Sequence, residues 1–284
     1  MNEQVFHTVL SIFAFVLGGM VGSFLNVCVY RLPRNLSVVK PRSRCPKCEN
    51  SIAWYDNIPM VSWLLLGAKC RHCGVPISWQ YPLVEAITAA LFLFVYWRFG
   101  ITLATPVYML LSASLVLVTF VDLTDWTIPN EVTFPGIPLG LALSLVAMFY
   151  PESNLHVEGN LLPVFDSLLG VLLGGGSLYL LDKLSLVLLK KRGMGFGDVK
   201  LLAMLGAFFG WPSVIAIIMI ASIIGSIVGI AYILYQKTKG DTEDAHYLPF
   251  GPYLSVAGLV VMFFGQQIFN FYFDFMIASP PSMM

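Results

Sequence analysis

The sequence predicts an all-α polytopic membrane protein with about eight transmembrane helices and a cytoplasmic zinc-binding loop after the first of them. Hydrophobic residues make up 57% of the 284 residues and charged residues 11%, with a mean hydropathy of +0.79. A soluble chain of this length does not need so much apolar surface. Four of the five cysteines lie in one long polar stretch that interrupts the apolar runs. The formal net charge is zero, which gives no indication of a nucleic-acid partner.

The first apolar run covers residues 5–29 and is long enough to cross about 30 Å of hydrocarbon. We expect a retained span, because the run lacks the basic start and the small-residue cleavage site of a signal peptide. Asn26 within it is expected to join helices, with ligand contact as the alternative. The span at 199–210 is short and bounded by glycine, so we expect it to be tilted or only partly inserted. Further spans are predicted at 82–98, 103–121, 131–150, 164–189, 199–210, 213–235 and 252–273.

Basic residues predict the orientation of these spans. Residues 31–80 contain eight of the 16 Lys and Arg residues but only two acids. The positive-inside rule therefore places this loop in the cytoplasm and the N-terminus outside. Eight spans then put three more loops on the cytoplasmic side, at 122–130, 190–198 and 236–251. The chain divides into a first transmembrane helix (1–30), the cytoplasmic loop (31–80) and a seven-helix membrane domain (81–284).

Two Cys-x-x-Cys pairs in the cytoplasmic loop predict a structural zinc site, with the ligands Cys45, Cys48, Cys70 and Cys73. Four thiolates suit tetrahedral Zn²⁺. A loop of this size buries little core, so a metal would hold it folded. A redox dithiol or unliganded thiols are the alternatives. The apolar segment 53–67 between the pairs could lie back on the membrane, form a peptide-binding face, or be the core of the zinc module.

Two acids at predicted cytoplasmic helix ends are candidates for catalysis. Asp122 ends the third span, and Asp198 closes a Gly-x-Gly-Asp motif with Gly195 and Gly197. The predicted topology puts both at the same membrane depth. Two carboxylates close together share a proton, since both cannot ionise cheaply. Such a pair can hydrolyse a peptide bond, one carboxylate activating water and the other protonating the carbonyl. Helix capping or salt bridges to Lys200 or Arg192 are the alternative roles.

Three further residues are expected to support this pair. Asp125 lies one helical turn beyond Asp122, so we assign it a capping or indirect role. Glu85 lies just inside the second span, where an acid indicates function. It is expected either to pair with Lys200 or to meet substrate or catalytic groups.

The order and spacing of these motifs resemble those of the type IV prepilin peptidases, which are bifunctional leader peptidases and N-methyltransferases of bacteria. The likeness covers nearly the whole chain. It is carried by residues 22–27 (Gly-Ser-Phe-Leu-Asn-Val), 30–33 (Tyr-Arg-Leu-Pro), both cysteine pairs, 81–85 (Tyr-Pro-Leu-Val-Glu), 122–129, 195–198 and 249–252 (Pro-Phe-Gly-Pro).

The resemblance implies an aspartic endopeptidase of the bacterial inner membrane whose active site faces the cytoplasm. Asp122 and Asp198 match the family's catalytic aspartates. The substrates would be type IV prepilins or type II secretion pseudopilins, whose new N-terminus would be methylated from S-adenosylmethionine. The family's methyl-transfer motif has Gly-Lys before the third cysteine; here Lys69 matches, while Ala68 stands in place of the glycine.

Three other functions remain as alternatives. A peptidase-only intramembrane aspartyl protease would share the Gly-x-Gly-Asp motif but would not call for a zinc module. A proton-coupled transporter would use the two acids for ion coupling, although such proteins place their sites at the membrane midplane. A membrane-anchored zinc scaffold would have no activity. Lipid is an expected partner, and glycines such as Gly225 and Gly229 allow packing within the bundle or in a homo-oligomer.

Overall fold

The computed structural model describes residues 2–150, 162–190, 195–239 and 248–277. Parts of three predicted loops, including Lys191, Arg192 and Gly193, lie outside the described residues. The described residues form helices and no strands, as predicted. They form two compact units, Met1–Pro129 and Asn130–Met284, which we describe separately. The division into segments 1–30, 31–80 and 81–284 stays a prediction.

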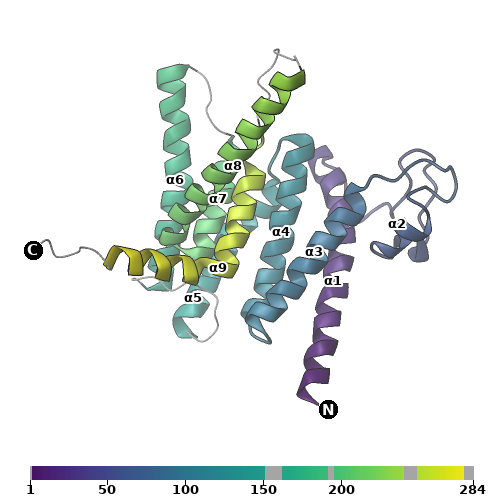
Figure 1. Cartoon of the computed structure of the whole chain (residues 1–284), viewed down its shortest axis with the longest axis horizontal. Coiled ribbons are helices and arrows are strands. Elements are labelled where there is room, and N and C mark those ends of the chain that lie inside the picture. Colours follow the sequence, from purple (N-terminus) through teal and green to yellow (C-terminus); the bar gives the residue numbers. More distant parts are fainter. Residues whose placement is uncertain (1, 151–161, 191–194, 240–247, 278–284) are drawn as a thin grey trace, which may run out of the picture. The chain divides into compact units, whose positions relative to one another are not determined.

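The first unit is built on three long helices with the cysteine loop inserted between the first two (Figure 1). α1 lies against both α3 and α4. The close contact of α1 with α3 depends on glycine: a Cβ at Gly22 would lie 2.7 Å from Glu85 Cα, and one at Gly18 would lie 2.7 Å from Ala89 Cα. The elements of this unit are α1 (Glu3–Arg31), η1 (Leu32–Arg34), η2 (Trp54–Asn57), α2 (Val61–Leu65), α3 (Gln80–Phe99) and α4 (Ala104–Asp125).

The second unit surrounds one short helix with four longer ones (Figure 1). α7 contacts each of the other four helices, and all of its residues from Leu201 to Phe209 are buried. A helix with apolar residues on every side belongs in such a core. The helices are α5 (Asn130–Phe149), α6 (Pro163–Leu189), α7 (Phe196–Phe209), α8 (Trp211–Lys239) and α9 (Gly251–Ile277).

Seven helices of the described residues are long and apolar enough to cross a membrane. They correspond to seven of the eight predicted spans. The eighth, α7, has 14 residues and a length of about 21 Å, which is shorter than the hydrocarbon core. Its burial by neighbouring helices explains how so short an apolar helix is accommodated, in agreement with the expectation of an incompletely spanning segment.

The contact of α6 with α7 predicts a matched pair of substitutions. A Cβ at Gly206 would lie 2.2 Å from the Gly170 carbonyl oxygen, which is backbone and cannot move aside, whereas a Cβ at Gly176 meets nothing within 4 Å. We expect Gly206→Ala to destabilise the protein by about 1–3 kcal/mol through overpacking, and Gly176→Ala to leave it unchanged or slightly more stable. Thermal unfolding of detergent-purified protein measures both. Equal stability of the two variants would contradict this packing.

Candidate active site

Asp122 lies in the last turn of α4 and is only 6% exposed. The sequence placed the loop at 122–130, but the helix continues to Asp125. Trp126 ends it in the left-handed region (φ 57°), and its N–H donates to the Asp122 carbonyl oxygen at 3.1 Å. Asp122 and Asp125 are therefore both helical, three residues apart on one face of α4.

Asp198 lies in the first turn of α7 and is 8% exposed. The predicted loop reached residue 198, but the helix begins at Phe196 with Gly195 as its N-cap. The Asp198 N–H donates to the Gly195 carbonyl oxygen at 3.1 Å. A Cβ at Gly195 would lie 3.4 Å from Asp198 Oδ2, an ordinary van der Waals distance, so this carboxylate lies directly beside Gly195. The helix dipole favours negative charge at this position.

Each candidate aspartate is thus a buried carboxylate in a terminal turn of its helix. Asp122 belongs to the unit Met1–Pro129 and Asp198 to Asn130–Met284, so their meeting in one site stays a prediction. The same holds for the alternative pairing of Asp122 with Lys200. Within each unit, packing fixes the backbone that carries the carboxylate, as a preorganised catalytic group requires.

Lys200 is held at the start of α7 by groups of its own unit. Its Nζ donates to Asn130 Oδ1 and lies 5.1 Å from the centre of the Phe134 ring and 5.4 Å from that of Phe196. Such contacts with aromatic faces are favourable for an ammonium group. Lys200 therefore joins the Asp198 turn to the first turn of α5, which begins at Asn130, one residue before the predicted span.

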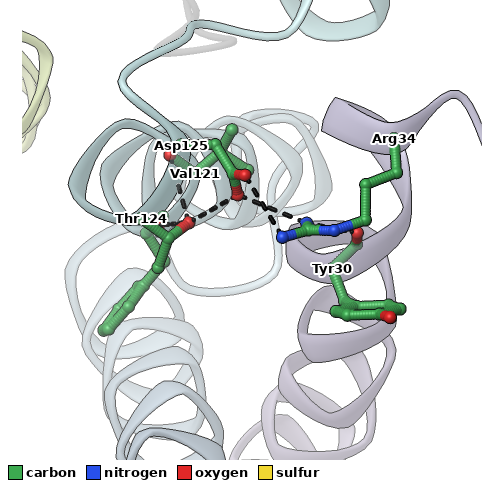
Figure 2. Close-up of polar contacts among 6 residues, drawn as sticks. Tyr30, Arg34, Val121, Thr124 and Asp125 are labelled. Carbon is green, nitrogen blue, oxygen red and sulfur yellow. Dashed lines mark hydrogen bonds and ion pairs between the residues drawn. The ribbon is translucent and has the colours of Figure 1, made fainter. Parts of the chain in front are cut away.

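Asp125 forms an ion pair that sequence reasoning missed (Figure 2). Arg34 reaches from the end of α1 to α4, with 3.3 Å between its Nη2 and Asp125 Oδ1. The Thr124 hydroxyl donates to Asp125 Oδ2 at 3.0 Å. The guanidinium also donates to the Tyr30 carbonyl oxygen at 2.8 Å and lies 4.6 Å from the centre of the Tyr30 ring. Arg34 was counted only as one basic loop residue, because 91 positions separate it from its partner.

Glu85 connects α3 with the cysteine loop. Its Oε2 accepts a hydrogen bond of 2.6 Å from the backbone N–H of Met60. Met60 has φ 61°, an unusual conformation just before α2, and the hydrogen bond helps to hold it. The expected pairing of Glu85 with Lys200, or its contact with substrate, stays a prediction. Asn26 confirms its expected role, since its Nδ2 donates to the Tyr81 carbonyl oxygen at 3.0 Å and joins α1 to α3.

The Glu85 contact predicts how the loop is held. In Glu85→Ala, the Met60 N–H loses its acceptor, which costs about 1–3 kcal/mol if the group stays buried. We therefore expect faster proteolysis within residues 53–67 while α1 and α3 stay intact. Limited proteolysis followed by mass spectrometry of the fragments checks this. Glu49→Ala is the control, because the Glu49 side chain makes an exposed ion pair with Arg44. A Glu85→Ala variant as resistant to proteolysis as this control would contradict the role.

The four loop cysteines gather into one cluster that could hold a metal ion. Their Sγ atoms all lie within 4.8 Å of one another, and those of Cys45 and Cys73 are 3.8 Å apart. Four Zn–S bonds of about 2.3 Å in a tetrahedron place neighbouring sulfurs roughly 3.8 Å apart, whereas a disulfide needs about 2.05 Å. The donor set and its spacing therefore fit zinc better than a redox dithiol.

Both halves of the cluster have the same local fold. Cys45 N–H donates to the Asn50 carbonyl oxygen, and Cys70 N–H to that of Val75. A residue with positive φ follows each pair, Glu49 and Gly74. In the first half, the backbone N–H groups of Cys48 and Lys47 lower the pKa of the Cys45 thiol to about 6. The Cys45 thiolate is thus the favoured form at neutral pH, whereas at Cys73 the Val75 N–H, which lowers the pKa of the thiol, is outweighed by burial and by hydrogen bonds with the other cysteines, which raise it to about 11.

Lys69 is exposed and lies directly before the second cysteine pair, in an isolated bridge with Pro76. Ala68 before it has φ 57°, in the left-handed region that costs an L-residue about 1–2 kcal/mol. The backbone thus adopts the conformation that suits glycine at the position where the family motif has one.

This turn predicts a stabilising substitution. Ala68→Gly removes the steric cost of positive φ, so we expect the loop to gain about 1 kcal/mol of stability. The measurement is resistance of residues 31–80 to proteolysis at increasing temperature. Ala53→Gly is the control, because Ala53 has φ −67° and gains nothing from glycine. A destabilised Ala68→Gly variant would show that the Ala68 methyl group matters more than the backbone.

The apolar segment 53–67 is not simply the core of the zinc module. Trp54 is 81% exposed, Leu64 70% and Leu65 80%. Only part of the segment turns inward: Ser62 is buried, and Trp63 Nε1 donates to the Ile77 carbonyl oxygen at 3.1 Å. The expectation of a module core is therefore wrong for its largest apolar side chains, while a membrane-facing or peptide-facing surface agrees with their exposure.

Comparison with known proteins matches both parts of the chain. Residues 16–99 match the bacterial peptidase A24 N-terminal domain, and residues 109–230 match the type IV leader peptidase family. The chain is 40% identical over 247 residues to a prepilin leader peptidase/N-methyltransferase of Myxococcus xanthus, covering 87% of this chain and 70% of that protein. Proteins of the same name from Pseudomonas aeruginosa and Neisseria gonorrhoeae are 35% identical over 283 residues and 36% over 272. The first alignment covers 92% of this chain and 92% of the Pseudomonas protein, and the second covers 87% of this chain and 88% of the Neisseria protein. No solved structure matches the chain.

Proposed function

Because the chain belongs to the type IV leader peptidase family, we propose that it removes the basic leader from type IV prepilins or type II secretion pseudopilins. It then methylates the newly exposed α-amino group. The observation that carries this proposal is the match of most of the chain to proteins whose names join both activities. A match limited to residues 109–230 would have supported the peptidase alone.

In the proposed cleavage, Asp122 and Asp198 share one proton around a water molecule. The ionised carboxylate takes a proton from the water, which attacks the peptide carbonyl, while the protonated carboxyl donates to the carbonyl oxygen. The C–N bond then breaks and the leaving amine takes up a proton. The burial of both carboxylates supports this role, because a low dielectric strengthens proton sharing.

The supporting groups keep these carboxylates in place. The Gly195 carbonyl oxygen accepts from the Asp198 N–H, and Lys200 ties that turn to α5 through Asn130. Asp125 fixes the end of α4 through Arg34. We assign these residues positioning roles rather than direct contact with the scissile bond.

The cysteine cluster is proposed to hold one structural zinc ion, which would stabilise the loop rather than take part in either reaction. S-Adenosylmethionine supplies a methyl group on a sulfonium sulfur; the amine gains this methyl and loses a proton, and S-adenosylhomocysteine is released. Lys69 remains a candidate contact for methyl transfer. The excess of basic residues in the loop supports an active site on the cytoplasmic side of the bacterial inner membrane, with the N-terminus outside.

The test is a reaction of the purified chain with a prepilin in detergent, followed by mass spectrometry of the new N-terminus. The proposal predicts a truncated pilin, which becomes methylated when S-adenosylmethionine is added. Truncation without methylation would support the peptidase-only alternative. No truncation of any prepilin or pseudopilin would overturn the proposal in favour of a transporter or scaffold.

A further inference from the structure

A cavity of about 230 Å³ lies within the unit Met1–Pro129, among the ends of α1, α3 and α4. Its lining combines a guanidinium, a carboxylate, two phenols and two amides, which come from Arg34, Asp125, Tyr30, Tyr81, Asn26 and Gln80. These groups come from α1, η1, α3 and α4, which the packing of α1 on α3 and of α3 on α4 brings together. Most of these polar groups have no role in the proposed cleavage.

The ion pair at this cavity is loose. Arg34 and Asp125 approach to 3.3–3.4 Å, and their side chains are 44% and 24% exposed. A guanidinium has five N–H donors and a carboxylate accepts several hydrogen bonds. Both groups can therefore bind a ligand that carries an anion and a cation side by side. The Tyr30 ring, already beside the guanidinium, offers an aromatic face for a further cation. Figure 2 shows Arg34 between the Tyr30 ring and Asp125.

We propose that this cavity binds the methionine end of S-adenosylmethionine, an inference that rests on the proposed methyl transfer. Arg34 binds the α-carboxylate and Asp125 the α-ammonium, while the sulfonium lies near the tyrosines. The cavity is smaller than the roughly 300–1,000 Å³ usual for whole ligands, so the adenosine part extends toward its open side. No other residue set is required for the zwitterionic end.

The position of the cavity suits a second reaction on the same substrate. Asp125 and Asp122 are three residues apart on α4, which places their Cβ atoms about 5–6 Å apart. Cleavage at Asp122 exposes the amine that is methylated. A methyl donor in this cavity lies one helical turn away, so the pilin need not leave the enzyme between the two reactions.

Binding of S-adenosylhomocysteine to the purified full chain, measured by calorimetry, tests this assignment. Arg34→Gln and Asp125→Asn should each weaken binding roughly tenfold or more, since each removes a charged hydrogen-bonding partner. Arg44→Gln is the matched control, because Arg44 pairs with Glu49 in the cysteine loop, and it should bind like the wild type. Wild-type affinity in both cavity variants would overturn the assignment.

A second measurement does not depend on variants. Ultraviolet crosslinking of S-adenosylmethionine labelled in its methyl group to the wild-type chain should label peptides that contain residues 26–34 or 78–81. Label confined to other peptides, in a chain that cleaves and methylates prepilin, would overturn the cavity and leave the proposed function standing. A chain that cleaves prepilin but binds no S-adenosylmethionine would overturn the methyl transfer and the cavity together.

A separate observation concerns the depth of α2. A Cβ at Gly19 would lie 3.4 Å from Pro59 Cβ, so the turn before α2 lies against Gly19 of α1. Gly19 is 12 residues before Arg31 at the end of α1, a distance of about 18 Å along the helix. Half of the hydrocarbon core is about 15 Å thick. The turn thus lies well below the end of α1, at a level that hydrocarbon occupies.

Three hydrogen bonds within the protein satisfy polar groups of this turn, as non-helical backbone at membrane depth requires. The Ser62 hydroxyl accepts from the Ile58 N–H at 2.9 Å and donates to the Tyr55 carbonyl oxygen at 2.9 Å. Glu85 accepts from the Met60 N–H. The large side chains that remain exposed on α2 are Val61, Leu64 and Leu65, and all three are apolar.

We infer that α2 dips into the cytoplasmic leaflet and that lipid acyl chains cover Leu64 and Leu65. Fluorescence quenching in nanodiscs of brominated phospholipid tests this. The emission added by Leu65→Trp should be quenched, and that added by Val39→Trp should not, although Val39 is as exposed as Leu65. Leu64→Trp gives an independent second probe. Emission at both positions 64 and 65 that brominated lipid leaves unquenched, in protein with normal zinc content, would overturn the inference.

Discussion

Asp122→Asn and Asp198→Asn should each lower the rate of leader cleavage by roughly 10²–10⁴-fold. Asparagine keeps the size of the side chain but can neither take up nor give a proton, and positioned acid–base groups contribute about this much to a rate. The affinity for prepilin should change little, because the leader and the apolar segment of the substrate still bind. The measurement is single-turnover cleavage of a labelled prepilin at saturating enzyme.

Two controls separate lost chemistry from lost folding. Asp182→Asn replaces a carboxylate within α6 that has no role in the proposed reaction, and it should cleave at nearly the wild-type rate. Methylation of a pilin peptide that already lacks its leader should persist in both catalytic variants, since that reaction needs no peptide hydrolysis. Wild-type cleavage in either catalytic variant would remove that residue from the mechanism.

Loss of one zinc ligand should remove the metal and with it the folded structure of the cysteine loop. Wild-type protein is expected to carry about one zinc per chain, and Cys45→Ser close to none. Structural zinc sites contribute about 10–16 kcal/mol of apparent binding free energy in small peptides, and the loop has little core to replace it. Elemental analysis gives the zinc content, and proteolysis within residues 31–80 reports the loss of structure. Cys28→Ser is the control, because Cys28 is buried in α1 outside the cluster.

The pH dependence of zinc retention has a defined sign. Because the pKa of the Cys45 thiol is lowered to about 6, the thiolate is present above this pH and is lost as the pH falls through it. Bound metal lowers the apparent value further. Zinc content should thus decline as the pH falls, because protons compete with the metal for the thiolates. Equal metal content in the wild type and in Cys45→Ser would contradict the cluster as the metal site.

Hydropathy predicted the long helices well because each of them is a continuous run of mainly apolar residues. Helix ends were less certain: the predicted loops included Asp122 and Asp198, yet both residues lie in helices. The short helix α2 could not be found, since its five residues depend on contacts with α1 and α3. The cysteine cluster was predictable because its ligands are close in sequence and of one type.

The contacts that shape the candidate sites were harder to predict. Arg34 and Asp125 are far apart in sequence, and the residues next to each of them do not indicate the other as its partner. The same applies to Glu85, because its partner is a backbone N–H, which every residue except proline has and which the sequence therefore cannot point to. Glycines gave a better signal: Gly22 and Gly206 marked helix faces that another backbone approaches closely, but not which helix it would be.

The central claim is that Asp122 and Asp198 act as one unit on a single peptide bond, and a double-substitution experiment tests it most directly. Cleavage by Asp122→Asn, Asp198→Asn and the combined variant is compared under identical single-turnover conditions. Groups that act together lose nearly everything when one is removed, so the account predicts a double variant about as slow as either single variant. Losses that multiply, as for independent sites, would contradict it.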